Sequence, residues 1–136
     1  MDLLDAMSQA AKGMKAQGVR MRVISENMAN ADTTANAPGQ DPYQRKTISF
    51  KSILNKATHQ KEVAVDKITS DSSDFILKYE PGHPAADKNG YVKTPNINPL
   101  VEMMDMREAQ RSYEANLGVI DMAKSMLMRT LDLLSR

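Results

Sequence analysis

The two histidines and their neighbouring carboxylates are the residues of this chain that could do acid–base or metal chemistry. His83 lies in the segment Tyr79-Glu80-Pro81-Gly82-His83-Pro84, and Asp87 follows four residues later. Such a pair could relay a proton. Neither His83 nor His59 has a second ligand at a metal-binding spacing, and flanking prolines are typical of a turn. We therefore interpret His83 as a turn residue, and a small hydrolase using His83 and Asp87 remains the alternative.

Other catalytic signatures are missing from the sequence. The chain has no cysteine, which removes thiol nucleophiles, disulfides and cysteine zinc ligands. It has no GxGxxG or GxxxxGK[ST] phosphate loop and no GxSxG nucleophile turn. Its serines and lysines show no pairing that would activate a nucleophile. We expect no catalytic site, no metal and no cofactor.

The charge pattern argues against a nucleic-acid partner. The formal net charge is +1, and residues 1–31, 32–101 and 102–136 each lie within one charge of neutrality. There are two phenylalanines and no tryptophan. A phosphate-binding surface needs a basic block, and single-strand recognition needs stacking aromatics. We therefore expect that the chain binds no nucleic acid.

The sequence also lacks a segment for direct membrane insertion. No apolar run approaches the length of about 18 residues that is needed to span a bilayer. The first residues contain Asp2 and Asp5 where a secretory signal has basic residues, and no continuous apolar stretch follows. If the protein is exported, we expect it to be exported without a cleaved signal peptide.

Methionines recur every seven residues near the N-terminus and predict an amphipathic helix over residues 1–31. Asp2 is a suitable N-cap, and Asn30 with the following Ala-Asp-Thr-Thr is a stop signal. Ile24 adds the second position of a heptad pattern. The predicted seam of this helix is Met7, Met14, Met21, Ile24 and Met28.

A second long helix is predicted over residues 99–136. Asn98 is a good N-cap, and Pro99 suits the first helical position. From Met103 the apolar spacing alternates between three and four, although Gln110 and Lys124 interrupt it. The predicted seam is Met103, Met106, Tyr113, Leu117, Ile120, Leu127, Leu131 and Leu134. We expect the two terminal helices to pair as a coiled-coil-like α layer that forms one α domain.

The C-terminal helix carries a second apolar stripe on another face. Its members are Val119, Met122, Met126 and Leu133. One partner helix covers one seam, so this stripe would face water in a monomer, and soluble monomers rarely expose a large apolar patch. We infer that the helix contacts another chain. The alternative is that the middle region folds over the stripe.

The middle region, residues 32–98, is predicted to be extended chain with a few short strands. All six prolines fall between Pro38 and Pro99. Short apolar segments occur at 47–50, 62–65 and 75–79, and Asn89-Gly90 predicts a turn before Tyr91. The predicted fold class is therefore mainly α, with a small β or extended middle region.

Two polar features of the C-terminal helix need interpretation. Four carboxylates lie beside Arg107 and Arg111, and we interpret them as a solvated helix face: Glu102, Asp105, Glu108 and Glu114. Tyr113 lies on the seam with Asn116 close by. Polar groups at a seam can fix helix register, and the equally good alternative is an ordinary packed tyrosine.

Several segments resemble the flagellar rod and hook axial protein family. Ile24–Thr34 resembles the N-terminal signature of that family, and Asp41–Lys46 resembles the segment that follows it in one branch. Tyr79–Asp87 and Gly90–Asn96 are similar to the proximal-rod branch, and Glu102–Met106 and Arg111–Asn116 resemble the C-terminal signature. The motif residues are Asn27, Ala29, Asn30, Pro81, Gly82, His83, Pro84, Gly90, Tyr91, Pro95, Asn96, Glu102, Met103, Arg111, Tyr113, Ala115 and Asn116.

The resemblance implies a non-enzymatic subunit of the bacterial flagellar basal-body rod. Such subunits are exported unfolded through the flagellar type III export apparatus, and they assemble in the periplasm into a helical drive shaft that transmits torque for motility. The implied partners are copies of the chain, other rod proteins and the export-gate and MS-ring side of the basal body. The terminal helices would form an inner layer around the export channel. The alternatives are another rod or hook axial protein, or a soluble helical-hairpin adaptor.

We predict that both terminal helices are marginally stable in the monomer and become ordered on assembly. Interior glycines weaken the N-terminal helix, and long helices depend on tertiary packing for most of their stability. Hydrogen exchange on dilute purified protein should show fast exchange in 1–31 and 100–136. Strong protection of both segments in the monomer would contradict this prediction.

Overall fold

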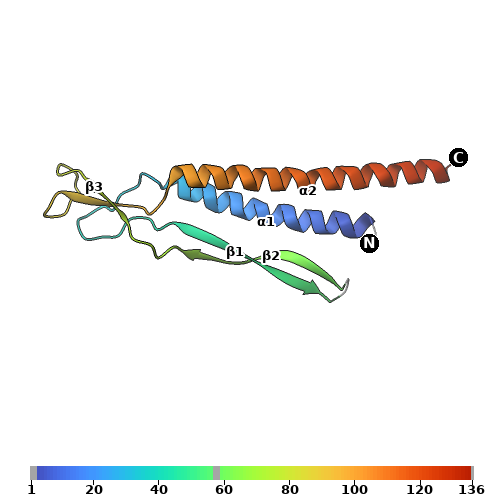
Figure 1. Ribbon diagram of the computed structural model, residues 1–136, viewed down its shortest axis with the longest axis horizontal. Coiled ribbons are helices and arrows are strands. Elements are labelled where there is room, and N and C mark those ends of the chain that lie inside the picture. Colours follow the sequence, from blue (N-terminus) through green and yellow to red (C-terminus); the bar gives the residue numbers. More distant parts are fainter. Residues whose placement is uncertain (1–2, 57–58, 136) are drawn as a thin grey trace. The chain divides into compact units, whose positions relative to one another are not determined.

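The computed structural model describes residues 3–56 and 59–135, and it contains two long helices and four strands (Figure 1). The expected N-cap Asp2 and the chain ends Met1 and Arg136 lie outside the described residues. The elements follow the chain in this order: α1 (Leu3–Ala29), β1 (Lys46–Asn55), β2 (Gln60–Ser70), β3 (Ile76–Tyr79), β4 (Tyr91–Thr94) and α2 (Pro99–Leu134).

The two predicted terminal helices are confirmed, but the middle region contains more strand than expected. β1 and β2 have 10 and 11 residues and form one two-stranded sheet, and β3 and β4 form a second. The fold is therefore mixed rather than mainly α. The long strands were missed because most of their side chains are exposed, so apolar residues do not mark their full length.

The chain divides into two compact units, and each contains parts of both helices. Unit 1 comprises Met1–Met21, Ser49–Lys67 and Arg107–Arg136, and unit 2 comprises Arg22–Ile48 and Ile68–Met106. The sequence division into two helices and a separate middle region follows the order of the chain, whereas each unit combines segments that are distant in sequence.

In unit 1, α1 and α2 run antiparallel at short distance. Gly13 faces Asn116, and Arg20 lies 3.4 Å from Glu108. Residue numbers therefore increase along α1 in the direction in which they decrease along α2. The buried side chains here are alanines, namely Ala10, Ala16, Ala109 and Ala123. Small side chains let two helix backbones approach closely, so this contact is built on small residues rather than on the large apolar ones.

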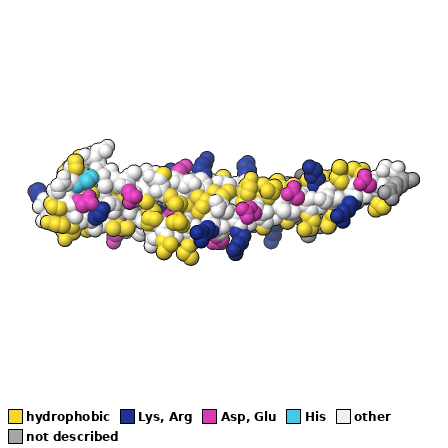
Figure 2. Space-filling model, turned by 90° about the horizontal axis from the view of Figure 1, so that it is seen from above, with side chains coloured by type: hydrophobic (Ala, Val, Ile, Leu, Met, Phe, Trp, Pro, Cys, Tyr) yellow, Lys and Arg dark blue, Asp and Glu magenta, His cyan; other side chains and the backbone are white. Residues whose placement is uncertain are grey.

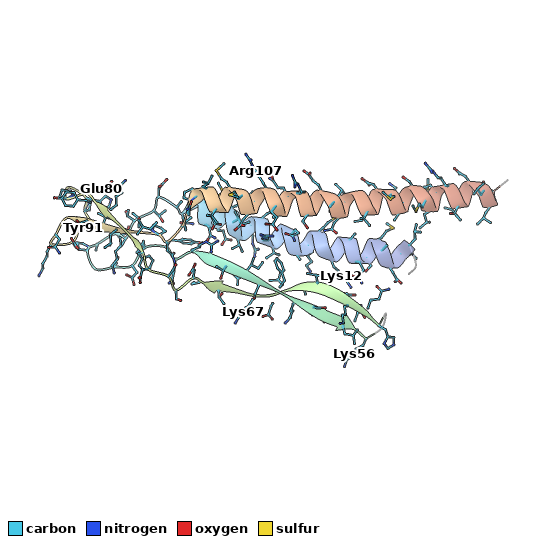
Figure 3. The ribbon with its side chains drawn as sticks, viewed as in Figure 1. Lys12, Lys56, Lys67, Glu80, Tyr91 and Arg107 are labelled. Carbon is cyan, nitrogen blue, oxygen red and sulfur yellow. The ribbon has the colours of Figure 1, made fainter. Side chains whose placement is uncertain are left out.

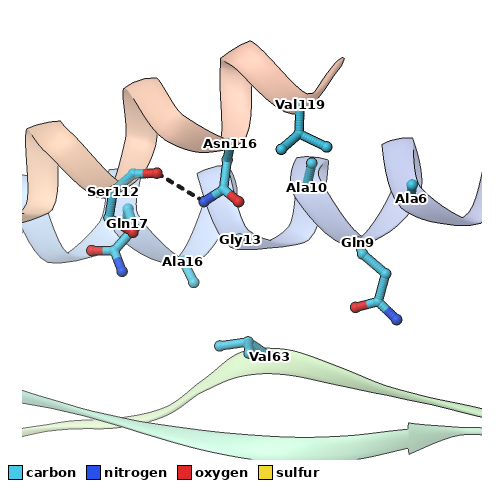
Figure 4. A pocket seen from close by; sticks show the side chains of 10 residues that line it. All are labelled: Ala6, Gln9, Ala10, Gly13, Ala16, Gln17, Val63, Ser112, Asn116 and Val119. Atoms are coloured by element: carbon cyan, nitrogen blue, oxygen red, sulfur yellow. Dashed lines mark hydrogen bonds between the residues drawn. The ribbon is translucent and has the colours of Figure 1, made fainter. Parts of the chain in front are cut away.

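The hairpin of β1 and β2 meets α1 through polar side chains in unit 1. Gln9 donates from Nε2 to Gln60 Oε1 at 2.9 Å, and Gln60 donates to Asp5 at 2.8 Å. Lys12 forms an ion pair with Glu62. Figure 4 shows Val63 of β2 facing α1 across a cavity of about 460 Å³. The hairpin is therefore attached to α1 by a polar row with apolar space beside it.

In unit 2, β3 and β4 pair antiparallel with Tyr79 opposite Tyr91. The predicted Asn89-Gly90 turn is confirmed: Gly90 has φ +84°, and a Cβ there would lie 2.9 Å from the Tyr79 ring. Asp87 Oδ1 accepts hydrogen bonds from the backbone N–H groups of Asn89 and Tyr91. The two tyrosine rings meet edge to face at 5.3 Å. Backbone and ring packing together fix this hairpin.

We predict opposite effects of the same substitution at two glycines of α1. Alanine should stabilise an exposed helix position by about 1 kcal/mol relative to glycine. Gly18 has open space around it, so Gly18→Ala should raise the free energy of unfolding by about that amount. At Gly13 a Cβ would lie 2.8 Å from Asn116 Nδ2, which donates to Ser112 O. Gly13→Ala should therefore lower stability by about 1 kcal/mol through overpacking.

Urea unfolding of the two variants measures both effects on the same helix. Equal stabilisation by Gly13→Ala and Gly18→Ala would show that the helices do not approach closely at Gly13.

Candidate functional site

A buried polar cluster joins the end of α1 to the start of α2 in unit 2. Asn27 and Glu102 are each 1% exposed. Asn27 Nδ2 donates to Glu102 Oε2 at 3.2 Å and to the Lys46 carbonyl at 2.9 Å. Asn27 Oδ1 accepts from the Lys46 N–H at 2.9 Å and from the Tyr43 hydroxyl at 3.0 Å. One amide thus uses both of its ends to hold α1, the segment 43–46 and α2 together.

Arg45 supplies the positive charge of this cluster. Its Nε donates to Glu102 Oε1 at 2.6 Å, and its guanidinium also lies 3.6 Å from Asp71 and 3.8 Å from Asp105. Burial by itself would lower the pKa of Arg45, but the hydrogen bond and charge of Glu102, with the charges of Asp71 and Asp105, outweigh it and raise the pKa. The guanidinium therefore stays charged beside a buried carboxylate, as a buried ion pair requires.

The neighbours of Arg45 extend the cluster in two directions. The Arg45 N–H donates to Asn96 Oδ1 at 2.9 Å, and Asn96 Nδ2 donates to Ser73 Oγ at 2.7 Å. On the other side Lys46 is paired with Glu26 at 2.9 Å, and this hydrogen bond lowers the pKa of Glu26. The cluster therefore connects residues that lie more than 50 positions apart in the sequence.

This arrangement corrects the interpretation of the α2 carboxylates as a solvated face. Glu102 is buried, whereas the Glu108 side chain is 69% exposed. Helical spacing places a residue on a face, but Arg45, which buries Glu102, comes from another part of the chain. The charged groups of the cluster pair with one another, so we assign the cluster a role in holding the fold together. Within residues 3–56 and 59–135 no group of three or more His, Cys, Asp or Glu could hold a metal ion.

His83 and Asp87 each form their own hydrogen bonds with the backbone. His83 Nδ1 accepts a hydrogen bond from the Ala85 N–H at 3.1 Å, and its Nε2 lies 3.4 Å from Thr34 Oγ1. Asp87 Oδ1 accepts hydrogen bonds from two backbone N–H groups and so stabilises the turn before β4. Both residues therefore have turn-forming contacts, as the turn interpretation of His83 expects.

The remaining family-motif residues are distributed between caps, turns and surface. Asn30 donates to the Glu26 carbonyl both from Nδ2 at 2.7 Å and from its backbone N–H at 3.2 Å, at the C-terminal end of α1. Gly90 and Pro95 are buried in unit 2. His83, Asn96, Tyr113 and Asn116 are half-buried. The exposed motif residues are Ala29, Pro81, Gly82, Pro84, Tyr91, Met103, Arg111 and Ala115.

The row of α2 that is buried in the single chain differs from the expected seam. The buried positions are Glu102, Ala109 and Ala123, and Asn116 lies against Gly13 between them. Of the expected seam residues, Ile24 is buried, and Met7, Met14, Met21, Met106, Tyr113, Ile120 and Leu127 are half-buried. Met28, Met103, Leu117, Leu131 and Leu134 are exposed. The helix contact is rotated toward small residues, which a search for large apolar residues passes over.

The second apolar stripe of α2 is exposed along its whole length. Met122 is 62% exposed and Leu133 is 76% exposed, and Val119 and Met126 are also exposed. Figure 2 looks onto the molecule from above and shows apolar side chains at the surface among scattered charges. No helix in the described part of the chain is long and apolar enough to cross a membrane. Because large exposed apolar patches are typical of interaction sites, the stripe is a candidate surface for contact with another protein.

Comparison with known proteins shows which sequences are similar to this chain over nearly its full length. The flagellar basal-body rod protein FlgC of Agrobacterium fabrum is 50% identical over 135 residues, which covers 98% of this chain and 97% of that protein. FlgC of Bacillus subtilis is 40% identical over 148 residues, with 98% and 99% covered. FlgC of Salmonella typhimurium is 38% identical over 133 residues, with 98% of each chain covered.

The chain belongs to the FlgC family of flagellar basal-body rod proteins. A family model described as the C-terminal part of flagellar basal body rod FlgEFG proteins also matches, at residues 88–133. The C-terminal segment is therefore similar across several axial proteins, whereas the full-length similarity is to FlgC. This agrees with the resemblance of the middle segments to the proximal-rod branch.

Membership of the FlgC family settles the class of function. The chain is a structural subunit of the flagellar basal-body rod and contributes to motility, and it is not an enzyme. It assembles with other rod components in the basal body. The hydrolase and adaptor alternatives are thereby set aside.

Sequence reasoning missed two central residues of the polar cluster in this FlgC-family chain. Tyr43 and Arg45 stand in the segment that resembles one branch of the family, but their chemistry was not assigned. The local sequence gave only a weak signal, because Arg45 stands between Asp41 and Lys46 in a polar loop. Its partners Asp71 and Glu102 come from later segments, so the pairing is visible only after folding.

We predict that Arg45→Met destabilises the protein by about 3 kcal/mol, because it leaves the Glu102 charge buried without its cation. The double variant Arg45→Met/Glu102→Leu should be less destabilised than the sum of the two single variants. Urea unfolding of the four proteins gives the coupling energy. The matched surface pair is Lys78 and Glu80, where Lys78→Met should cost less than 1 kcal/mol.

Additive single effects at Arg45 and Glu102 would contradict the cluster as described. A large effect of Lys78→Met would show that the exposure of the pair does not set its contribution.

Proposed function

We propose that the chain polymerises with copies of itself and with other rod proteins through the exposed apolar residues of α2. The observation that carries this proposal is the second stripe, whose four members are all exposed in the single chain. Burying a large apolar side chain stabilises by roughly 1.5–3 kcal/mol, so a covered stripe adds a substantial driving force. In a rod, neighbouring subunits are available to cover the stripe.

The C-terminal end of α2 supports the same proposal. In unit 1 Gly13 lies opposite Asn116, so an antiparallel helix pair of equal rise brings Leu3 opposite Met126 or nearby. The last two turns of α2 therefore extend past the first described residue of α1. They are apolar on several faces, and Met128, Leu131, Leu133 and Leu134 are all exposed. Arg129 and Asp132 are the charged residues of these turns, and the large exposed apolar side chains beside them favour a contact with another protein.

The geometry of such contacts favours an open polymer. A stripe on one subunit and a different surface on the next form a heterologous contact, and repeated heterologous contacts that do not close produce a helical filament. We propose that the helices form the inner layer around the export channel and that the polymer transmits torque. We further propose export by the flagellar type III apparatus and contact with the export gate and the MS ring. Membership of the FlgC family supports these finer proposals.

We extend this proposal to the expected-seam residues that are exposed in the single chain, of which Met28 lies on α1. They are Met28, Met103, Leu117, Leu131 and Leu134. In this proposal the small residues of α2 face its own α1, and the large ones face neighbouring subunits.

We predict that Met122→Asp prevents rod assembly while the chain still folds, because a charge placed in a buried apolar contact is costly unless it is paired. Ser125→Asp is the matched control, since Ser125 is exposed on the same helix but outside the stripe. Each variant should be expressed in cells that lack the native gene, followed by swimming assays and electron microscopy of basal bodies. Met122→Asp should give non-motile cells with incomplete rods, and Ser125→Asp should restore swimming.

Circular dichroism of the two purified variants should match that of the native chain. Normal swimming with Met122→Asp would contradict the assignment of the stripe to an assembly contact.

A further inference from the structure

The distal part of the β1–β2 hairpin carries positive charge that the described residues do not neutralise. Between Ser49 and Lys67 there are four lysines and two acids. Both acids are already paired, Glu62 with Lys12 of α1 and Asp66 with Lys51 at 3.0 Å. The other lysines are exposed, and none has an ion-pair partner among the residues that the structure describes: Lys56, Lys61 and Lys67.

Exposed apolar side chains lie beside these lysines on the same hairpin. Leu54 is 56% exposed, and Phe50, four residues earlier on the same face of β1, is exposed too. Figure 3 shows Lys56 and Lys67 on the outer side of the hairpin, away from α1, whereas Lys12 lies between α1 and the hairpin. The hairpin thus presents exposed lysines beside exposed apolar side chains. Leu54, Lys56, Lys61 and Lys67 do not line the cavity that Val63 shares with Val119 of the α2 stripe.

The type of cation indicates what this surface contacts. The segment 46–70 contains five lysines and no arginine. Protein interfaces are enriched in arginine and depleted in lysine, because the planar guanidinium forms fixed paired hydrogen bonds. Lysine is a mobile, strongly hydrated point charge that suits a diffuse array of anions. An anionic lipid surface offers such an array and also accepts apolar side chains at its boundary.

We propose that the β1–β2 hairpin binds to the surface of an anionic phospholipid bilayer. Lys56, Lys61 and Lys67 contact the phosphate groups, and Leu54 enters the headgroup layer. The contact is peripheral and requires no spanning helix. It uses a different surface from rod assembly, so it does not depend on the polymerisation proposed above.

Vesicle co-sedimentation of the full purified chain tests the proposal. Vesicles of phosphatidylglycerol with phosphatidylcholine should bind the chain, and vesicles of phosphatidylcholine alone should bind it far less. Each lysine near an anionic surface strengthens binding roughly fivefold, so Lys56→Gln/Lys61→Gln/Lys67→Gln should weaken it about a hundredfold. High salt should weaken binding of the native chain, because salt screens exposed charges.

Two matched controls separate the hairpin from net charge and from α2. Lys88→Gln/Lys124→Gln/Arg129→Gln removes the same charge from exposed positions elsewhere and should bind like the native chain. Leu54→Ser should weaken binding, whereas Leu133→Ser, at an exposed leucine of α2, should not. Circular dichroism confirms that each variant is folded.

Four outcomes would overturn the proposal. They are equal binding to neutral vesicles, equal loss in the control triple variant, loss of binding through Leu133→Ser, and binding to heparin or to an acidic protein without binding to anionic vesicles. The first and third indicate an apolar contact made by α2, the second a general charge effect, and the fourth a polyanion or protein partner.

Discussion

The buried negative charge of Glu102 is the constraint on which unit 2 depends. A carboxylate that is 1% exposed is stable only where a cation and hydrogen-bond donors meet it. Arg45 provides the cation and Asn27 a donor, so three segments must come together before the charge is satisfied. Because a hydrophobic pair of the same shape could be as stable, we attribute to this cluster a role in specifying one arrangement of the chain.

The cluster also connects the end of α1 and the start of α2 to the middle region. Asn27 holds the backbone of Lys46 at the start of β1, and Asn96 holds the segment before α2 to Arg45 and Ser73. Three motif residues of unit 2, Asn27, Asn96 and Glu102, therefore belong to one network. A structural subunit that carries load needs its helices and its hairpins joined in a defined geometry, and these contacts provide it within the unit.

In unit 1 the use of small residues at the helix contact determines which side chains remain outside. Ala109 and Ala123 are buried, and Asn116 lies against Gly13, whereas Met122, Leu131 and Leu133 are exposed. A helix pair built in this way leaves its largest apolar side chains available to neighbours. The exposed surface is thus a consequence of how the monomer is packed, and it matches the need of a rod protein to associate on several sides.

The sequence by itself determined the two long helices, the Asn89-Gly90 turn, the family and the second stripe. These features follow from local periodicity, capping residues and short motifs, which depend on neighbours a few positions away. It did not predict the length of β1 and β2, because their exposed side chains carry little apolar pattern.

Only the tertiary structure decided which face of α2 is buried and that Glu102 is part of a cluster. Both depend on partners far away in sequence: Gly13 for Asn116, and Arg45 for Glu102. From sequence alone, a charged residue on a helix is expected to be solvated, and an alanine does not indicate a helix contact. Their roles arise from the close approach of another segment, a property of the folded chain that no local pattern encodes.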